Sequence, residues 1–266
     1  MSDGAAPILR CDGLVKTFPG VQALRSVDFA VTPGRVHGLV GENGAGKSTL
    51  LKILAGVYRP DGGSIALNGA PLTLGGTDDA LRHGIVTIHQ DINLVGSLTV
   101  ADNIMLNNEP TAGPLGFLKR REIDRRTEEL LRFYEIDARP QALVSDLPND
   151  AKKMIQILKA IVRQAKVLLM DEPTSSLTDV EVRLVLRLIR SLAEQGVGVV
   201  FVSHYLSEVF EVCDEITVLR DGAVAASGPR AATSLPEVVR AMLGRSLETA
   251  PERRASAATP EPLLAV

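Results

Sequence analysis

A glycine-rich loop that follows a short apolar run constrains the fold of this chain more than any other feature. Residues 41–48 read GENGAGKS and match the pattern GxxxxGK[ST] at every defined position. The apolar run at residues 36–40 predicts a buried strand, and the apolar spacing from Leu50 to Leu54 predicts a helix after the loop. A chance match is about a one-in-a-hundred event for a chain of this length. The sequence therefore predicts a phosphate-binding loop between a strand and a helix.

Each residue type in this loop has a physical role in holding a polyphosphate. Glycines let backbone N–H groups wrap the phosphates, and the following helix adds its positive end. Lys47 supplies a positive charge to the β- and γ-phosphates, and the Ser48 hydroxyl can ligate Mg²⁺. The candidate nucleotide-binding residues of the loop are Gly41, Asn43, Gly44, Ala45, Gly46, Lys47, Ser48 and Thr49.

Further apolar runs predict the rest of a sheet. Buried strands are expected at residues 166–170 (KVLLM), 198–203 (GVVFVS) and 215–219 (EITVL), and an amphipathic helix at residues 180–192. Continuous apolar strands that alternate with helices are typical of an α/β fold with a parallel sheet covered on both faces.

The middle and the end of the chain have different patterns. Residues 124–136 and 152–162 have helical spacing, and no strong strand run lies between them. We therefore expect a largely helical insertion over about residues 91–165. Residues 249–266 are rich in Ala and Pro and aperiodic, which predicts a disordered tail.

Two carboxylates and a histidine follow predicted strands. Asp171 and Glu172 end the strand at 166–170, and His204 follows the strand at 198–203. Downstream of a complete phosphate loop, the first carboxylate is expected to hold Mg²⁺ and the second to polarise a water for attack on the γ-phosphate. Because α/β sheets place ligands at the carboxyl ends of their strands, His204 is expected to contact the γ-phosphate.

Two other residues have alternative interpretations from the sequence. Gln90 ends the apolar run at residues 85–90 and is equally consistent with a solvated loop amide. Phe18 precedes a Pro-Gly turn, and it is either a core residue or a platform for an adenine ring, which needs only a π-face.

Composition excludes several classes of protein. The 29 Lys+Arg and 32 Asp+Glu residues give a formal charge of −3, which argues against charge-driven binding of nucleic acid. Two distant cysteines indicate neither a disulfide scaffold nor a zinc site and fit a reduced cytosolic compartment. The basic residues at 119–121 and 125–126 are interpreted as the solvated start of a helix. No run approaches 18 consecutive apolar residues, so no membrane span is predicted.

The order of these features resembles that of the ATP-binding subunits of ABC transporters. The resemblance covers about residues 7–245 and includes the phosphate loop, Gln90, the Asp171-Glu172 pair followed by PTSSLTD, and His204. It implies an α/β P-loop NTPase (RecA-like) core with a parallel sheet, a helical subdomain and a small N-terminal β portion. It also implies that ATP and Mg²⁺ are bound.

The resemblance also implies roles for single residues. Phe18 would stack on adenine, and Ser48, Gln90 and Asp171 would hold Mg²⁺. Gln90 would in addition couple the nucleotide site to a membrane subunit.

The resemblance implies catalytic roles for two further residues. Glu172 would be the catalytic base and His204 the γ-phosphate switch, acting beside Gln90. Two such domains would sandwich two ATP molecules head to tail.

Four segments are similar to one branch of the family, the ATPases of monosaccharide importers (the ribose, galactose and xylose group). They read GVYRPDGGSI, NLVGSLTVADNIML, MIQILKAI and DEPTSSLTDVEV. The branch implies an ATPase subunit that energises sugar import from the cytoplasmic face of the cell membrane. Its partners would be membrane-spanning permease subunits, a second ATPase subunit and a periplasmic or extracellular sugar-binding protein, with no nucleic acid. Because this branch usually fuses two ATPase halves, a chain of one half's length is expected to pair with another.

One segment departs from the family pattern. The signature LSGGQ is replaced by LPNDA at residues 147–151. Pro148 has neither a hydroxyl nor an N–H group, and Asp150 puts a carboxylate where the partner's γ-phosphate would approach. This favours a heterodimer with an ATPase of intact signature. The alternatives are a hydrolysis-poor regulatory subunit, or normal hydrolysis supported by Asn149 and helix N–H groups.

Overall fold

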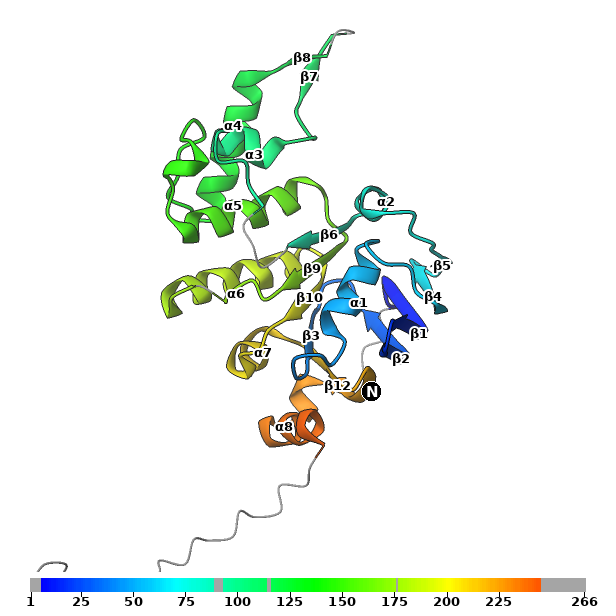
Figure 1. Cartoon of the computed structure of the whole chain (residues 1–266). Coiled ribbons are helices and arrows are strands. Elements are labelled where there is room, and N and C mark those ends of the chain that lie inside the picture. The colour runs from blue at the N-terminus through cyan, green and yellow to red at the C-terminus, as the bar shows by residue number, and fades with distance from the viewer. Residues whose placement is uncertain (1–5, 89–92, 114–115, 176, 245–266) are drawn as a thin grey trace, which may run out of the picture.

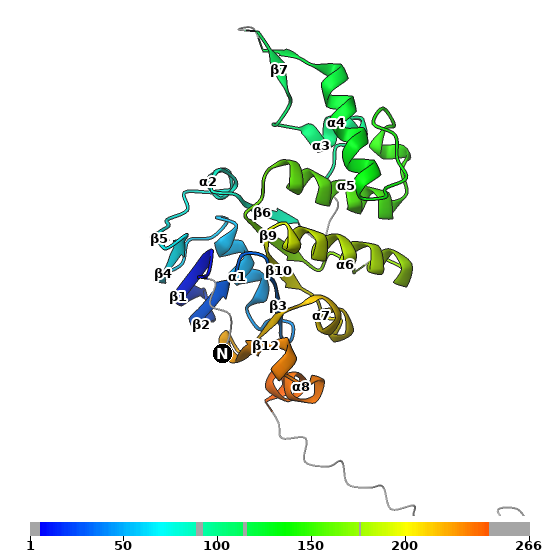
Figure 2. The same cartoon turned by 180° about the vertical axis from the view of Figure 1, so that it is seen from behind.

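The computed structural model describes residues 6–88, 93–113, 116–175 and 177–244 (Figures 1 and 2). The strands are β1 (Leu9–Phe18), β2 (Val21–Val31), β3 (Val36–Val40), β4 (Gly62–Leu67), β5 (Ala70–Pro71), β6 (Ile85–Ile88), β7 (Thr111–Ala112), β8 (Phe117–Leu118), β9 (Val167–Asp171), β10 (Gly198–Val202), β11 (Glu215–Arg220) and β12 (Ala223–Pro229). The helices are α1 (Lys47–Leu54), α2 (Thr77–Arg82), α3 (Val100–Met105), α4 (Arg120–Phe133), α5 (Asn149–Val162), α6 (Asp179–Glu194), α7 (Leu206–Val212) and α8 (Leu235–Leu243), with 3-10 turns at Val144–Asp146 and Arg230–Ala232.

The central sheet has the strand order β12-β11-β3-β10-β9-β6 within the described residues. The strands from β11 to β6 run parallel to one another, as predicted. At one edge of this sheet, β12 pairs antiparallel with β11. The cause is the tight turn between them, since Asp221 and Gly222 both have positive φ and reverse the chain as a hairpin.

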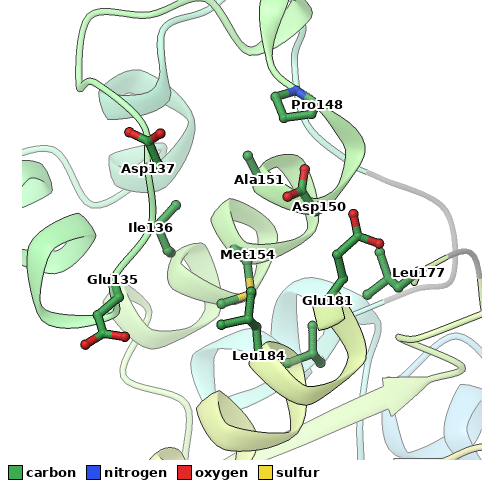
Figure 3. A pocket seen from close by; sticks show the side chains of 11 residues that line it. Glu135, Ile136, Asp137, Pro148, Asp150, Ala151, Met154, Leu177, Glu181 and Leu184 are labelled. Atoms are coloured by element: carbon green, nitrogen blue, oxygen red, sulfur yellow. The ribbon is translucent and has the colours of Figure 1, made fainter. Parts of the chain in front are cut away.

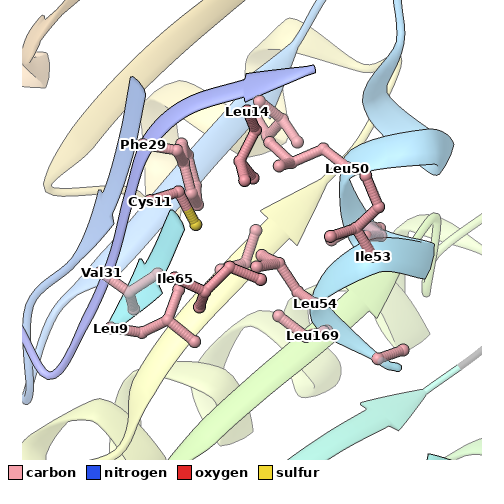
Figure 4. Close-up of a cluster of buried hydrophobic side chains, with 14 of the residues drawn as sticks. Leu9, Cys11, Leu14, Phe29, Val31, Leu50, Ile53, Leu54, Ile65 and Leu169 are labelled. Carbon is pink, nitrogen blue, oxygen red and sulfur yellow. The ribbon is translucent and has the colours of Figure 1, made fainter. Parts of the chain in front are cut away.

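The apolar strand runs are explained by burial on both faces. Leu169 and Val200 pack into a cluster with β1, β2 and α1, which Figure 4 shows. Their sequence neighbours Leu168 and Phe201 pack on the opposite face, in a cluster that includes residues of α5, α6 and α7. Alternate side chains thus enter two cores, which is why these strands carry no polar face.

A second, antiparallel sheet (β2-β1-β4-β5) covers α1 from outside. Leu9, Phe29 and Ile65 of this sheet share a buried cluster with Leu50 and Ile53 of α1 (Figure 4). The small N-terminal β portion is therefore a full layer, and it fixes the helix that starts at the phosphate loop.

A helical region lies between β6 and β9 and has its own core. Residues of α3, α4 and α5 form a third buried cluster, which includes Ile104, Ile123 and Ile155. The helix predicted at 124–136 is α4, which begins earlier, at Arg120. It also ends earlier, at Phe133, because Glu135 has a φ of 54° and reverses the chain. The pair β7–β8, at the far end of this region in Figure 1, was not predicted, because strands of two residues leave no periodic pattern.

The remaining predictions concern a membrane span, the C-terminal tail and the domain boundaries. No helix in the described ranges is long and apolar enough to span a bilayer. The predicted tail at 249–266 lies outside the described residues, and the proposed boundaries at 7, 91, 165 and 245 stay predictions.

Candidate active site

Three strands of the central sheet end level with one another. Val202 of β10 pairs with Leu39 of β3 on one side and with Asp171 of β9 on the other. The segments that follow these residues therefore leave the sheet at the same edge. They carry the phosphate loop, Glu172 and His204, which is the convergence expected at the carboxyl ends of parallel strands.

The phosphate loop is braced from behind by a close backbone approach. Gly46 has a φ of 107°, and a Cβ at this position would lie 2.7 Å from the carbonyl oxygen of Ala23 in β2. The hairpin turn after β11 also supports the loop, because the N–H of Gly222 donates to the carbonyl of Ala45 at 3.1 Å. Glycine is required at position 46 both by backbone conformation and by space.

Lys47 projects its charge into the loop. Its side chain is buried, and Nζ donates to the carbonyl oxygens of Gly41 (2.7 Å) and Glu42 (3.0 Å). Burial lowers the pKa of Lys47, whereas the negative charges of Glu172 and Asp171 act in the opposite direction. The motif predicted this cation, and the structure adds the two carboxylates whose charges it feels.

The rest of the loop suits an anion. Gly44 and Asn43 are exposed, and no atom of the described residues lies within 4 Å of a Cβ placed at Gly44. Ser48 and Thr49 lie in the first turn of α1, which contains no acidic residue. The first N–H groups of a helix have no acceptor within the helix, and its dipole favours negative charge there. A polyphosphate fits this arrangement of donors and charge.

Glu172 and His204 face each other across the ends of β9 and β10. Oε2 of Glu172 lies 3.4 Å from Nδ1 of His204. Glu172 has a φ of 48°, a conformation that costs a residue with a side chain about 1–3 kcal/mol. Its N–H donates to the carbonyl of Val202 at 3.0 Å, which ties it to the neighbouring strand.

A buried carboxylate behind this pair was missed by the sequence analysis. Glu208 of α7 accepts hydrogen bonds from the hydroxyls of Thr174 and Ser203. The available signal was its position four residues after His204, in the first turn of α7. That signal is weak, because an acidic residue in a first helical turn is common on exposed surfaces.

The signature segment begins α5. Pro148 is the residue before the first helical turn, and Asp150 lies within that turn, where a carboxylate complements the helix dipole. Asp150 also lines a pocket of about 240 Å³ between α5 and α6, together with Glu181 (Figure 3). Glu181 forms a capping box with Thr178 at the start of α6, so Thr178 has a structural role here.

Two further predicted site residues are Phe18 and Gln90. Phe18 ends β1, where its ring packs edge-on against Tyr58 at 5.3 Å and Nζ of Lys16 lies 5.5 Å from its centroid. These contacts leave its role as an adenine platform a prediction. Gln90 lies outside the described residues.

Part of the predicted basic run is paired within its own helix, whereas Arg120 pairs with Asp102 of α3. Arg125 and Arg126 of α4 both donate to Glu122, at 2.8 and 2.6 Å. These charges form a solvated helix face, as the sequence analysis interpreted them.

The fold and the loop together match a known family. Residues 24–175 match the family model described as ABC transporter. The chain belongs to this family. The strand-end arrangement of the phosphate loop and the Asp171-Glu172 pair described above is thus that of an ABC-family protein.

Individual relatives agree with this membership. A ribose import ATP-binding protein, RbsA 1, of Rubrobacter xylanophilus is 48% identical over 93% of this chain and 49% of its own length. A putative ribose/galactose/methyl galactoside import ATP-binding protein of Agrobacterium fabrum is 46% identical over 92% of the chain and 48% of its own length. The chain therefore spans about half the length of the curated relatives it matches.

Solved structures share the fold. The ADP conformation of MJ1267, an ATP-binding cassette of an ABC transporter, superposes with a TM-score of 0.77 at 24% identity, covering 90% of this chain and all of that one. The structure of cbiO1 from Clostridium perfringens gives a TM-score of 0.75 at 25% identity, covering 88% and 93%. The P-loop NTPase fold class is thereby confirmed.

Proposed function

We propose that this ABC-family chain binds and hydrolyses ATP and that it energises import of a monosaccharide. The observation that carries the proposal is the level ending of β3, β10 and β9, which brings the phosphate loop together with Asp171 and Glu172. A phosphate-binding cation and a pair of strand-end carboxylates are the parts that phosphoryl transfer to water requires.

The proposed binding roles follow from the loop geometry. Lys47, the glycines of the loop and the start of α1 hold the β- and γ-phosphates. Ser48, Asp171 and Gln90 would hold Mg²⁺, which would neutralise charge on the phosphates. A hydroxyl and carboxylate oxygens suit this hard cation, and the charge of Asp171 is already felt at Lys47.

The proposed catalytic roles rest on the facing side chains of Glu172 and His204. Glu172 accepts a proton from the attacking water, and its carboxylate is held where the strands end. His204 contacts the γ-phosphate through the ring nitrogen that does not face Glu172. Phe18 provides the adenine platform.

The sugar and the partners are inferred from the relatives' names. The relatives described above are named as ribose or ribose/galactose/methyl galactoside import ATP-binding proteins. We infer that this chain acts at the cytoplasmic face of the cell membrane with permease subunits, a second ATPase subunit and, indirectly, a sugar-binding protein.

The second ATPase subunit is proposed to be a different chain. Asp150 is half-buried at the start of α5, and in a head-to-tail pair it would oppose the γ-phosphate of the partner site. A heterodimer would keep one site intact, formed by the loop of this chain and the signature of its partner. The same observation supports the second candidate, a regulatory subunit with little turnover.

The test is Mg-ATP binding and turnover by the purified chain. Wild type should bind Mg-ATP, and Glu172→Gln should bind it equally well while losing at least about 100-fold in turnover. Glu194→Gln is the matched control, because Glu194 is an exposed residue at the end of α6. Binding with no Glu172-dependent turnover would support the regulatory function, and absence of nucleotide binding would overturn both.

A further inference from the structure

A single buried carboxylate oxygen connects the loops that carry Glu172 and His204. Oε2 of Glu208 accepts a hydrogen bond from Oγ1 of Thr174 at 2.7 Å and another from Oγ of Ser203 at 2.8 Å. Thr174 lies two residues after Glu172, and Ser203 immediately precedes His204. The loop after β9 and the loop after β10 are therefore held by one atom on α7.

The three connected side chains are shielded from water. Thr174 and Ser203 are each 2% exposed, and Glu208 is 8% exposed. Hydrogen bonds in such surroundings are stronger than at the surface, and a buried polar group left without a partner is costly. The two hydroxyls thus have a strong preference for the positions that keep them on Glu208.

The backbone around the network limits its freedom further. The N–H of Tyr205 donates to Oγ of Ser203 at 3.0 Å, so this hydroxyl accepts one bond while it donates another. The residue between the two is His204, which is exposed and leaves this anchored segment toward Glu172. Its two anchored neighbours fix the backbone from which the imidazole extends.

The loop that carries Glu172 also depends on a hydrogen bond to Glu208, because its backbone conformation is unfavourable. Glu172 has a φ of 48°, which is an unfavourable conformation unless surrounding contacts hold it. Its own N–H is bound to Val202, and Thr174 fixes the chain on its other side. Loss of the Thr174 bond would let the loop relax and move the carboxylate.

The geometry points to Glu208 as a positioning residue that holds Glu172 and His204 in register for hydrolysis. It acts through Thr174 and Ser203 rather than on the reacting atoms. The inference rests on the proposed ATPase function, which supplies the reaction that the register serves.

Replacement of Glu208 separates positioning from charge. A glutamine Oε1 atom can accept both hydroxyls, so Glu208→Gln should keep turnover within about 3-fold of wild type. Glu208→Ala removes the acceptor, and kcat should fall at least about 10-fold while KM for ATP changes by less than about 3-fold. Equal losses in the two variants, or a loss confined to KM, would overturn the proposal.

A matched control variant and a double-mutant cycle of Thr174 and Glu208 exclude a general effect on folding. Glu211→Ala lies on the exposed face of the same helix and should leave kcat unchanged. Thr174→Val alone should lower kcat, but it should add little to Glu208→Ala, because both remove the same bond. A lower melting temperature with unchanged kcat per folded molecule would show a purely structural role and overturn the proposal.

A readout independent of turnover distinguishes failure of this inference from failure of the proposed function. The chain has four histidines, so the imidazole signal of His204 can be assigned by NMR with His204→Ala. Glu208→Ala and Thr174→Val should shift that signal, whereas Glu208→Gln and Glu211→Ala should not. An unmoved signal in Glu208→Ala would overturn the positioning role even if wild type hydrolyses ATP. A shifted signal in a chain without turnover would show that Glu208 positions His204 although the proposed function has failed.

Discussion

Nδ1 of His204 lies 3.4 Å from Oε2 of Glu172, although the two residues come from different strands. The approach orients the imidazole, because the nitrogen that faces the carboxylate leaves Nε2 as the polar atom on the opposite side of the ring. In the proposed function Nε2 is then available to the γ-phosphate, and the two side chains form a pair in which each constrains the other.

Removal of the imidazole should therefore slow hydrolysis without preventing binding. His204→Ala is expected to lower ATP turnover by about 10²-fold, the range for loss of one positioned polar group, and to leave the Kd for Mg-ATP within a few-fold. Steady-state turnover and calorimetric titration measure the two effects. His83→Ala, at the C-terminal end of α2, is the control. Turnover within twofold of wild type would remove His204 from the site.

Replacement of the loop lysine should have the opposite profile. Lys47→Ala removes the cation that the loop surrounds, so the Kd for Mg-ATP should rise at least about 100-fold, equivalent to roughly 3 kcal/mol. Lys52→Ala changes the same residue type on the exposed side of α1 and should bind like wild type. If both variants bind ATP normally, the loop does not hold the phosphates.

The local part of the site could be predicted from the sequence because its residues are adjacent in the chain. Lys47 and Ser48 come with their glycines, and Asp171 and Glu172 come at the end of an apolar run. The network around Glu208 could not be predicted in this way, because it forms only when α7 packs against two strand ends. Its prediction would require the burial of Glu208, the directions of the Thr174 and Ser203 hydroxyls and the distances between them.

The fold, too, could be predicted where the signal lies in adjacent residues and could not where it depends on contacts between distant segments. The buried strands β3, β9 and β10 could be predicted because both faces are covered and, apart from His37 and Asp171, none of their residues is polar or charged. The β1–β2 layer was predicted only as a small β portion implied by the family resemblance. Its role against Gly46 depends on the carbonyl of Ala23, and a backbone contact leaves no side-chain pattern in the sequence.

A buried histidine outside the site should make folding sensitive to acid. His37 of β3 is 4% exposed, and burial lowers its pKa from the usual value of 6.5 to about 4. Nε2 lies 2.8 Å from Oγ1 of Thr217, and the partly exposed Glu215 lies 3.4 Å from Nδ1 without reversing the shift. The folded state therefore binds fewer protons than the unfolded state between these pH values.

The sign follows from this difference in bound protons. Stability is full above pH 6.5 and falls as the pH drops toward 4, by about 3 kcal/mol from this group. Urea unfolding at pH 7.5, 5.5 and 4.5 measures the slope. His37→Gln should remove this part of the slope, and His83→Gln should retain it. An unchanged slope in His37→Gln would show that His37 titrates normally in the folded chain.

Repair of the signature tests how Asp150 and Pro148 affect hydrolysis. The variant Pro148→Ser with Asp150→Gly removes the carboxylate that would oppose a γ-phosphate and restores a hydroxyl at the start of α5. Turnover should rise at least about 10-fold and should still require Glu172. Asp146→Gly is the control, because it removes an exposed carboxylate just before the segment.

The stability of the repaired chain should change little, so a change in turnover can be attributed to the signature and not to unfolding. Loss of Asp150 from the first turn and gain of a glycine cost about 1–2 kcal/mol. Serine before the first turn can accept a hydrogen bond from a helix N–H, which contributes about 1 kcal/mol in the opposite direction. A melting temperature within a few degrees of wild type, together with higher turnover, would identify the signature as the defect and favour a heterodimer. Unchanged turnover would show that LPNDA supports hydrolysis and that a homodimer suffices.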